Sequence, residues 1–347
     1  MSNTRICVIG AGAIGGVTAA YMAKAGLDVT LVTKHAEIAA LANGEGLHIS
    51  GVRGNERIRV PAVASIEELT GVYQLCLIAT KAYDMPECAR LALPYLAEDS
   101  LVVSMQNGIC TDALSEVVGK ERTVGCVIGF GATMKGPGEL EMTSTGEFVI
   151  GLPDRSRPPL LETLREALSA VVPASISDDI YAELYSKLIV NACITALGAV
   201  CGLKLGEMMQ RNDARRIFLG VISEGVRVAD AMGLRIPPYG GKLDYHQLMR
   251  GTGVLDRLRR HLTIRVVGLK YSQLKSSSLQ SLERGRPTEI QYFNGYIVRK
   301  GTEVGVVCPI NSRLTEMVQE IEHKKRPIST ENLSDMKLVS ALDDKVG

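Results

Sequence analysis

A lysine and an asparagine stand one helical turn apart in an otherwise apolar segment. Lys187 and Asn191 lie within ELYSKLIVNAC (183–193), whose apolar residues Leu184, Leu188, Ile189 and Ala192 read as a buried helical stripe. Residues four apart on a helix are neighbours on one face. The pair is therefore either solvated, with Lys187 in an ordinary ion pair with Glu183, or part of a reactive site. The segment by itself favours neither interpretation.

A second polar constellation follows about ninety residues later. It consists of Ser276-Ser277-Ser278-Leu-Gln and then ERGRPTEIQYFNG at 283–295. Pro287 and Thr288 resemble a helix start, which predicts a helix over 288–304 with Glu289 in its first turn. Acidic residues stabilise the first turn of many helices, so Glu289 by itself is consistent with a structural role.

The N-terminus carries a glycine pattern in a context that suits a nucleotide. Arg5–Ile9 reads as a strand, GAGAIGG follows at 10–16, a helix runs to Ala25, and a second strand covers Asp28–Val32. In this order Gly10 permits a tight turn, Gly12 lets the backbone approach a pyrophosphate, and Gly15 lets the helix lie close to the sheet. The helix N-terminus offers free N–H groups to the phosphates. We therefore expect cofactor contacts from Gly10, Ala11, Gly12, Ala13, Ile14 and Gly15.

The end of the second strand bears on which dinucleotide binds. NAD-binding chains usually place an Asp or Glu there to bind the ribose 2′-hydroxyl. Here the strand ends in Thr33 and Lys34, and the first acid is Glu37. A cation at that place suits a 2′-phosphate and predicts NADP(H), whereas the alternative is that Lys34 is a solvated loop residue.

Two later strands also end in polar residues. The strand 75–79 is followed by Thr80-Lys81, and the strand 101–104 by Gln106-Asn107-Gly108. Ligands of doubly wound sheets lie outside the carboxyl ends of the strands, so Lys81 and Asn107 are predicted to line the same cofactor groove. Asn107 before Gly108 is also a favoured turn pair. Further strands between Thr123 and Gly151 are predicted to close the sheet as antiparallel additions.

Composition excludes several classes of protein. The chain has 347 residues with 39 basic and 38 acidic side chains, so no general basic field favours nucleic acid or an anionic membrane. No apolar run approaches the roughly 18–20 residues that are needed to span a bilayer. The eight cysteines form no CxxC pair and the five histidines no HExxH spacing, so a metal site is not predicted. A reducing cytoplasm fits this cysteine usage best.

The second half changes to helical periodicity. We predict a dinucleotide-binding Rossmann domain over 1–170, an all-helical substrate and dimerisation domain over 171–325, and a loosely held polar tail over 326–347. The segment 239–275 holds eight basic residues against two acids. It is either a solvated amphipathic helix pair or a wall that attracts an acidic substrate.

Together these motifs resemble the ketopantoate reductase (2-dehydropantoate 2-reductase) family. The matching pieces run in order along the chain: GAGAIGG at 10–16, Thr80-Lys81, QNG at 106–108, KLIVN at 187–191, SSSLQSLERGRPTEI at 276–290, Asn294-Gly295 and GVVCPIN at 305–311. The resemblance implies a Rossmann domain followed by a helical domain. It also implies NADPH-dependent reduction of 2-dehydropantoate to (R)-pantoate, on the route to pantothenate and coenzyme A.

The resemblance also assigns roles to individual residues. It maps the catalytic lysine, as general acid, onto Lys187 and the active-site acid onto Glu289. Asn107 is expected to contact both cofactor and substrate, and the other expected substrate contacts are Asn191, Thr195 and Ser277. A small-molecule 2-oxo acid and a second copy of the chain are the implied partners.

Three residues depart from the pattern of some family members. Thr195 and Leu205 stand where an asparagine is found in some of them, and Met142 stands where a histidine is common. These changes leave open a paralogue that acts on another branched or bulky 2-oxo acid, or oxidises the hydroxy acid. A non-catalytic NADP(H)-binding regulator is a third reading, although such a protein needs neither Lys187 nor Glu289.

Overall fold

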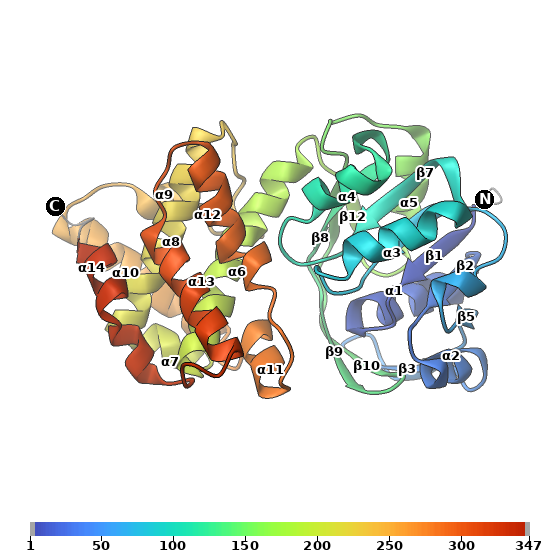
Figure 1. The fold of residues 1–347 in the computed structure, drawn as a ribbon, viewed down its shortest axis with the longest axis horizontal. Helices are drawn as coiled ribbons and strands as arrows, with labels where there is room; N and C mark the ends of the chain where they lie inside the picture. The colour runs from blue at the N-terminus through green and yellow to red at the C-terminus, as the bar shows by residue number, and fades with distance from the viewer. Residues whose placement is uncertain (1–3, 344–347) are drawn as a thin grey trace. The chain divides into compact units, whose positions relative to one another are not determined.

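The computed structural model describes residues 4–343 and divides into two compact units between Leu184 and Tyr185. The first unit is an α/β structure and the second is built from helices (Figure 1). The predicted fold class is confirmed. The division lies later than the predicted boundary at 170/171, because the strand at Ala174–Ile176 pairs with the strand at Phe148–Gly151 and so belongs to the first unit.

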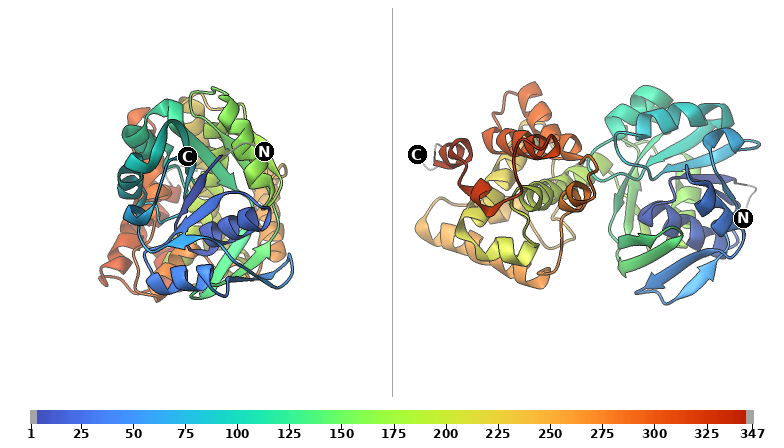
Figure 2. Two further views of the ribbon diagram at one scale, coloured as in Figure 1. Left: turned by 90° about the vertical axis from the view of Figure 1, so that its right-hand side faces the viewer. Right: turned by 60° about the horizontal axis from the view of Figure 1, so that its bottom comes forward.

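The main sheet of the first unit has eight strands in the order β12-β11-β8-β7-β6-β1-β2-β5. All pairs from β5 to β8 are parallel, and the chain reverses its direction of strand addition between β1 and β6. Helices α3 and α4 contact each other, as do α1 and α5, so the sheet is covered on both faces (Figure 2). The strands are β1 (Ile6–Ile9), β2 (Val29–Val32), β5 (Ala62–Val63), β6 (Tyr73–Ile78), β7 (Leu96–Ser104), β8 (Thr123–Ile128), β11 (Phe148–Gly151) and β12 (Ala174–Ile176). The helices are α1 (Ala13–Lys24), α2 (Ala36–Asn43), α3 (Met85–Ala92), α4 (Thr111–Val118) and α5 (Pro159–Ser169).

A second sheet covers the outer side of α1. It has four strands in the order β4-β3-β10-β9, namely β4 (Glu56–Ile58), β3 (Leu47–Gly51), β10 (Glu139–Ser144) and β9 (Gly131–Gly136). All four contact α1, whose residues from Gly15 to Met22 are all buried. A helix buried on every side needs apolar cover on both faces. A Cβ on Gly16 would overlap the Leu140 side chain of β10, so this glycine permits the close packing.

The prediction that strands 123–151 all extend the main sheet in antiparallel fashion was therefore wrong in part. Only β11 joins antiparallel, beside β8. Strand β8 is parallel to β7, while β9 and β10 belong to the second sheet, where β10 pairs in parallel with the distant β3.

The second unit is helical throughout its described residues. Its helices are α6 (Ile180–Cys201, whose first residues lie in the first unit), α7 (Leu205–Gln210), α8 (Asn212–Ala231), α9 (Tyr245–Met249), α10 (Val254–Lys270), α11 (Ser277–Glu283), α12 (Asn294–Glu303), α13 (Pro309–Glu322) and α14 (Met336–Asp343). Short 3-10 turns lie at Ile290–Tyr292 (η4) and Thr330–Ser334 (η5). The helix predicted over 288–304 is thus replaced by η4 and α12. Glu289 precedes η4 rather than occupying the first turn of a helix.

Helix α6 is the apolar centre of the second unit. By length and composition alone, this helix could cross a membrane, whereas no apolar run of sufficient length was expected from the sequence. However, 83% of its most apolar 18-residue stretch is buried inside the protein. Gly225 of α8 packs against Ile189, the thiol of Cys193 donates to the Phe218 carbonyl at 3.5 Å, and Tyr245 of α9 donates to the Ser186 carbonyl at 2.6 Å. These contacts are those of a core helix.

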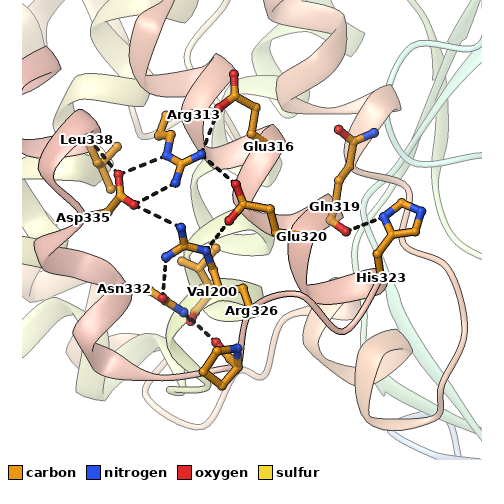
Figure 3. A network of polar contacts seen from close by, with 11 residues as sticks. Val200, Arg313, Glu316, Gln319, Glu320, His323, Arg326, Asn332, Asp335 and Leu338 are labelled. Atoms are coloured by element: carbon orange, nitrogen blue, oxygen red, sulfur yellow. Dashed lines mark hydrogen bonds and ion pairs between the residues drawn. The ribbon is translucent and has the colours of Figure 1, made fainter.

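Residues 326–343 of the predicted tail pack against the helical unit instead of being loosely held, and residues 344–347 lie outside the described part of the chain. Leu333 and Leu338 are buried, and α14 contacts both α13 and α8. Asn332 donates to the Val200 carbonyl of α6 at 2.8 Å. Arg313 of α13 donates two hydrogen bonds to Asp335, at 3.0 and 2.8 Å, and Arg326 bridges Glu320 and Asp335 (Figure 3). This ion-pair network fixes the segment that the sequence suggested was solvated.

The network predicts a pH-dependent stability. The hydrogen bonds from Arg313 lower the pKa of Asp335 from 3.8 to about 2, and the carboxylate is 12% exposed. A carboxylate with a lowered folded-state pKa stabilises the fold fully above its unfolded pKa, and this stabilisation is lost as pH falls toward about 2. Asp335→Asn is therefore expected to lower the free energy of unfolding by about 2 kcal/mol at pH 7. Denaturant unfolding between pH 2 and 7 should show that the difference in unfolding free energy between Asp335→Asn and the wild type shrinks below pH 4.

Glu303→Gln is the control for this prediction. Glu303 is 59% exposed and pairs with Lys300 at 3.0 Å, and a pair with so exposed a carboxylate contributes little to stability. A gap between Asp335→Asn and the wild type that stays constant down to pH 2 would contradict the assigned origin of the stabilisation.

Candidate functional site

The carboxyl ends of four neighbouring strands coincide at one edge of the main sheet. Ile9 of β1 is in register with Val32 of β2 and Ile78 of β6, and Ile78 is in register with Ser104 of β7. The segments that leave the sheet there are the glycine turn 10–15, Thr33-Lys34, Thr80-Lys81 and Gln106-Asn107. The structure therefore brings together every residue of the first unit that the sequence singled out for cofactor contact.

The glycine turn has a distinct geometric requirement at each glycine. Gly10 has φ +113°, which favours glycine, and a Cβ there would lie 2.9 Å from the carbonyl of Ala79. A Cβ on Gly15 would overlap the carbonyl oxygen of Gly10. A Cβ on Gly12 would meet nothing within 4 Å, so the described protein leaves the space beside Gly12 open to a ligand. Ala13 then begins α1 and presents its N-terminus to that space.

Strand β2 is followed by a lysine, Lys34, and no acidic residue stands at the end of the strand. Lys34 is exposed, and the hydroxyl of buried Thr33 accepts the backbone N–H of His35 at 3.2 Å. Burial raises the pKa of the Cys88 thiol in α3, and the nearby charge of Lys34 partly offsets that rise. Glu37 lies in the first turn of α2.

Gln106 holds two strand ends together, a role that the sequence did not reveal. Its buried amide donates to the carbonyls of Ile78 at 2.8 Å and Thr80 at 3.2 Å, and its oxygen accepts from Ser104 at 2.7 Å. Lys81 and Asn107, which follow the joined strand ends, are both exposed, and Gly108 turns the chain with φ +88°. Asn107 is therefore both the turn residue and an accessible amide.

Along α6 the incompletely buried residues form one stripe. Between Glu183 and Val200 only four residues are half-buried, and all the others are buried. They are Glu183, Lys187, Asn191 and Ile194. Their spacing of three to four residues places them on one face. Lys187 and Asn191 thus share the one open face of an otherwise enclosed helix.

The electrostatics of Glu183 speak against the simple ion pair with Lys187. Burial raises the pKa of the Glu183 carboxyl, and the neighbouring acids Glu147 and Asp179 raise it further. A cation paired with this carboxyl would lower its pKa instead. The solvated ion-pair interpretation of Lys187 is thereby weakened.

Thr195 and Ser277 differ in how accessible their hydroxyls are. Thr195 is buried, and its hydroxyl donates to the Asn191 carbonyl at 2.7 Å, so its only O–H donor is used within α6. Ser277 is exposed in the first turn of α11. The preceding residue, Ser276, caps α11 by accepting the Leu279 N–H at 3.1 Å and packs against Gly198 of α6.

Glu289 lies in a turn that is followed by a buried polar network. Its side chain is 8% exposed, and its carbonyl accepts from the Tyr292 N–H at 2.8 Å. Asn294, which begins α12 after this turn, donates to Asn311 at 2.9 Å. Asn311 in turn donates its amide to the buried carboxylate of Glu224 at 2.7 Å.

Glu224 also accepts the backbone N–H groups of Ile310 and Asn311 at 3.0 and 2.9 Å. It therefore caps the N-terminus of α13. We missed Glu224 from the sequence; a glutamate on the apolar face of a helix (VISEGVRVA) was the signal.

The two other departures from the family pattern are core residues. Met142 is fully buried in β10, and Leu205 is 1% exposed at the start of α7. Their side chains fill the interior. Among the described residues, no group of three or more His, Cys, Asp or Glu side chains could hold a metal ion.

Comparison with known proteins matches both units. Residues 6–155 match the family model described as "Ketopantoate reductase PanE/ApbA", and 179–322 match its C-terminal model. The chain is similar to the 2-dehydropantoate 2-reductase of Archaeoglobus fulgidus, with 28% identity over 93% of this chain and 99% of the relative. It is also similar to the 2-dehydropantoate 2-reductase of Pyrococcus abyssi, with 29% identity over 92% of this chain and 100% of the relative.

Solved structures share the fold along nearly the whole chain. A PanE/ApbA family ketopantoate reductase from Ralstonia eutropha JMP134 has a TM-score of 0.79 and 28% identity, covering 93% of this chain and 99% of that one. A D-mandelate dehydrogenase solved with NADH and anilino(oxo)acetate has a TM-score of 0.78 at 22% identity, covering 92% and 99%. A dimeric ketopantoate reductase from Staphylococcus aureus has a TM-score of 0.72 at 19% identity, covering 92% and 99%.

Proposed function

Because the chain belongs to the ketopantoate reductase PanE/ApbA family, we propose that it reduces 2-dehydropantoate to (R)-pantoate with NADPH. This reaction is a step toward pantothenate and coenzyme A. The observation that carries the proposal is the match of both units to the two family models, together with curated relatives of one name along more than nine-tenths of the chain.

The residues present suit a nicotinamide dinucleotide and a 2-oxo acid. The open space beside Gly12 and the N-terminus of α1 would receive the pyrophosphate. A bound nicotinamide cofactor would supply a hydride to the carbonyl carbon of the substrate, and the carbonyl oxygen would then carry negative charge. Lys187 stabilises that charge and donates the proton that completes the alcohol. Asn107, Asn191 and Ser277 are proposed to bind the substrate.

Glu289 is proposed to keep the lysine charged. Desolvation in a closed site lowers the pKa of a lysine, and a nearby carboxylate opposes this effect. The burial of Glu289 at 8% exposure suits such a role. Thr195 is a weaker substrate contact than its position suggested, since its hydroxyl proton is bonded to the Asn191 carbonyl.

Lys34 supports NADPH over NADH. The ammonium follows β2, where a 2′-phosphate would lie, and no acid occupies that strand end. Lys34→Asp is expected to weaken NADPH relative to NADH by about 10- to 100-fold, because a charge-assisted hydrogen bond is replaced by repulsion. Steady-state kcat/KM for both cofactors measures this change.

Lys24→Asp is the control for the cofactor prediction. Lys24 is also an exposed lysine of the first unit, at the far end of α1, where it pairs with Glu56. Its replacement should leave the cofactor ratio unchanged. If Lys34→Asp leaves the ratio of kcat/KM for NADPH and NADH unchanged, Lys34 does not bind a 2′-phosphate.

A second candidate substrate class is another branched or bulky 2-oxo acid. The buried Thr195 hydroxyl and the core position of Leu205 remove two polar contacts that would select a substrate hydroxyl. The purified chain should oxidise NADPH with 2-dehydropantoate, followed as loss of absorbance at the nicotinamide band. Turnover with 2-oxo acids lacking the terminal hydroxyl, but not with 2-dehydropantoate, would select this candidate. Cofactor binding with no turnover across the panel would select a regulator.

The assembly and location proposed for the chain follow from its family and its cysteines. We propose a homodimer, as in the Staphylococcus aureus relative. All eight cysteines are free thiols, and seven are buried. This pattern supports a reducing cytoplasm.

A further inference from the structure

Helix α10 presents an apolar stripe on the face opposite its packing surface. Its inner face holds buried Ile264 and Gly268, and Gly268 packs directly on Met209 of α7. The outer stripe of α10 consists of Leu255, Leu258, Leu262, Val266 and Leu269, which are 81, 65, 60, 56 and 59% exposed. Five large apolar side chains exposed in one row are unusual for a monomer.

The spacing within the outer stripe is symmetric about its centre. The intervals along the chain are three, four, four and three residues, with Leu262 in the middle. Two antiparallel copies of α10 crossing at Leu262 would bring Leu255 opposite Leu269 and Leu258 opposite Val266. Leu262 would face its own copy. An interface with two-fold symmetry requires this self-complementarity, because residue i meets j while j meets i.

We propose that the outer stripe of α10 is the interface of a homodimer, with the two-fold axis at Leu262. The proposal rests on the dimer proposed above and is independent of the reductase activity. Each stripe side chain exposes roughly 100 Å², so with Val254 and Tyr271 beside it the surface approaches the ~800 Å² per partner of a standard interface. Val254 and Tyr271 are 81 and 49% exposed.

The basic residues of α10 are compatible with this partner. Arg259 donates to the carbonyls of Gln247 and Arg250 at 2.9 and 2.7 Å, and Arg260 donates to the Gly251 carbonyl. These guanidinium groups are thus held toward the preceding segment. In the dimer Arg259 would stand near Arg265 of the second copy, a like-charge contact that salt would screen. A basic amphipathic helix can also bind an anionic membrane, but lipid requires no symmetric spacing.

The test uses the full chain in sedimentation velocity and light scattering at micromolar concentration. We expect a dimer of about 75 kDa, twice the 37.3 kDa of one chain, that is retained or strengthened in 0.5 M salt. Leu262→Asp would place two carboxylates at the axis and should weaken dimerisation at least 100-fold. Because Leu262 is 60% exposed in the single chain, the variant should keep its circular dichroism and melting temperature. Val307→Asp, at a 75% exposed position, should remain dimeric.

Cysteine cross-linking tests the position of the axis. With diamide as oxidant, Leu262→Cys should form a disulfide-linked dimer. Leu255→Cys should not, because two copies of residue 255 would lie about 20 Å apart. The wild type measures the background from its native thiols. A dimer unaffected by Leu262→Asp would place the interface elsewhere.

A wild-type monomer would overturn both the dimer and its interface, whether or not the chain reduces 2-oxo acids. A monomer that sediments with anionic phosphatidylglycerol vesicles, and is released by 0.5 M salt, would assign the stripe to a membrane instead.

Discussion

Replacing Lys187 with alanine is expected to lower kcat by about 10²- to 10⁴-fold while NADPH still binds, because general-acid catalysis contributes on that scale. Lys187 stands on the half-buried face of α6 that it shares with Glu183, Asn191 and Ile194. No residue of the glycine turn lies on this helix, so cofactor affinity should change little. Stopped-flow hydride transfer and NADPH fluorescence titration separate the two effects.

Lys187→Arg distinguishes proton donation from charge stabilisation. Arginine keeps the positive charge but does not release a proton near neutral pH. If proton transfer dominates, this variant should be nearly as slow as the alanine variant. Lys204→Ala is the matched control, since Lys204 is an exposed lysine of the same unit that bonds to Gln273 at 2.7 Å. Ordinary turnover in Lys187→Ala would remove the assigned role.

Glu224→Ala is expected to lower the free energy of unfolding by about 3–5 kcal/mol, because three buried donors would lose their acceptor. Two of these donors are the first backbone N–H groups of α13, and the third is the Asn311 amide. Glu224 is fully buried, so water does not replace the lost carboxylate readily. Denaturant unfolding followed by far-ultraviolet circular dichroism measures the change.

Asp230→Ala provides the comparison on the same helix. Asp230 is 54% exposed and contacts His246 at 2.8 Å, so its removal should cost less than about 1 kcal/mol. Equal effects of the two substitutions would show that Glu224 is not a buried cap. Through Asn311 and Asn294, the Glu224 variant should also loosen the turn that carries Glu289 and raise KM for the substrate.

The first unit was predictable where its signals are local. The glycine turn, the polar residues after β2, β6 and β7, and the parallel order all follow from short segments whose side chains report their own surroundings. The second sheet could not be predicted, because β10 pairs with β3, which lies about ninety residues away in the chain. Nothing in GELEM (138–142) indicates which strand it pairs with. The second sheet forms where the outer face of α1 needs apolar cover, and that need is not visible in the strand segment itself.

The helical unit shows the same limit in its charged segments. Residues 326–335 are polar and resemble a solvated tail, yet Arg326 and Asp335 are enclosed by partners from α13. A charge pattern does not show which charges meet after folding. Lys187 and Asn191 were found as a pair from spacing, whereas the Glu183 environment that disfavours the ion pair depends on Glu147, far away in the chain.

The burial of α1 between two sheets has a consequence for the energetics of cofactor binding. Since both faces of this helix are fixed during folding, the turn that precedes it is already ordered when the dinucleotide arrives. The conformational entropy of arranging the phosphate-binding N–H groups is thus lost at folding and not at binding. Substitutions that loosen the β9–β10 hairpin should therefore weaken cofactor affinity from a distance, by restoring freedom to the turn.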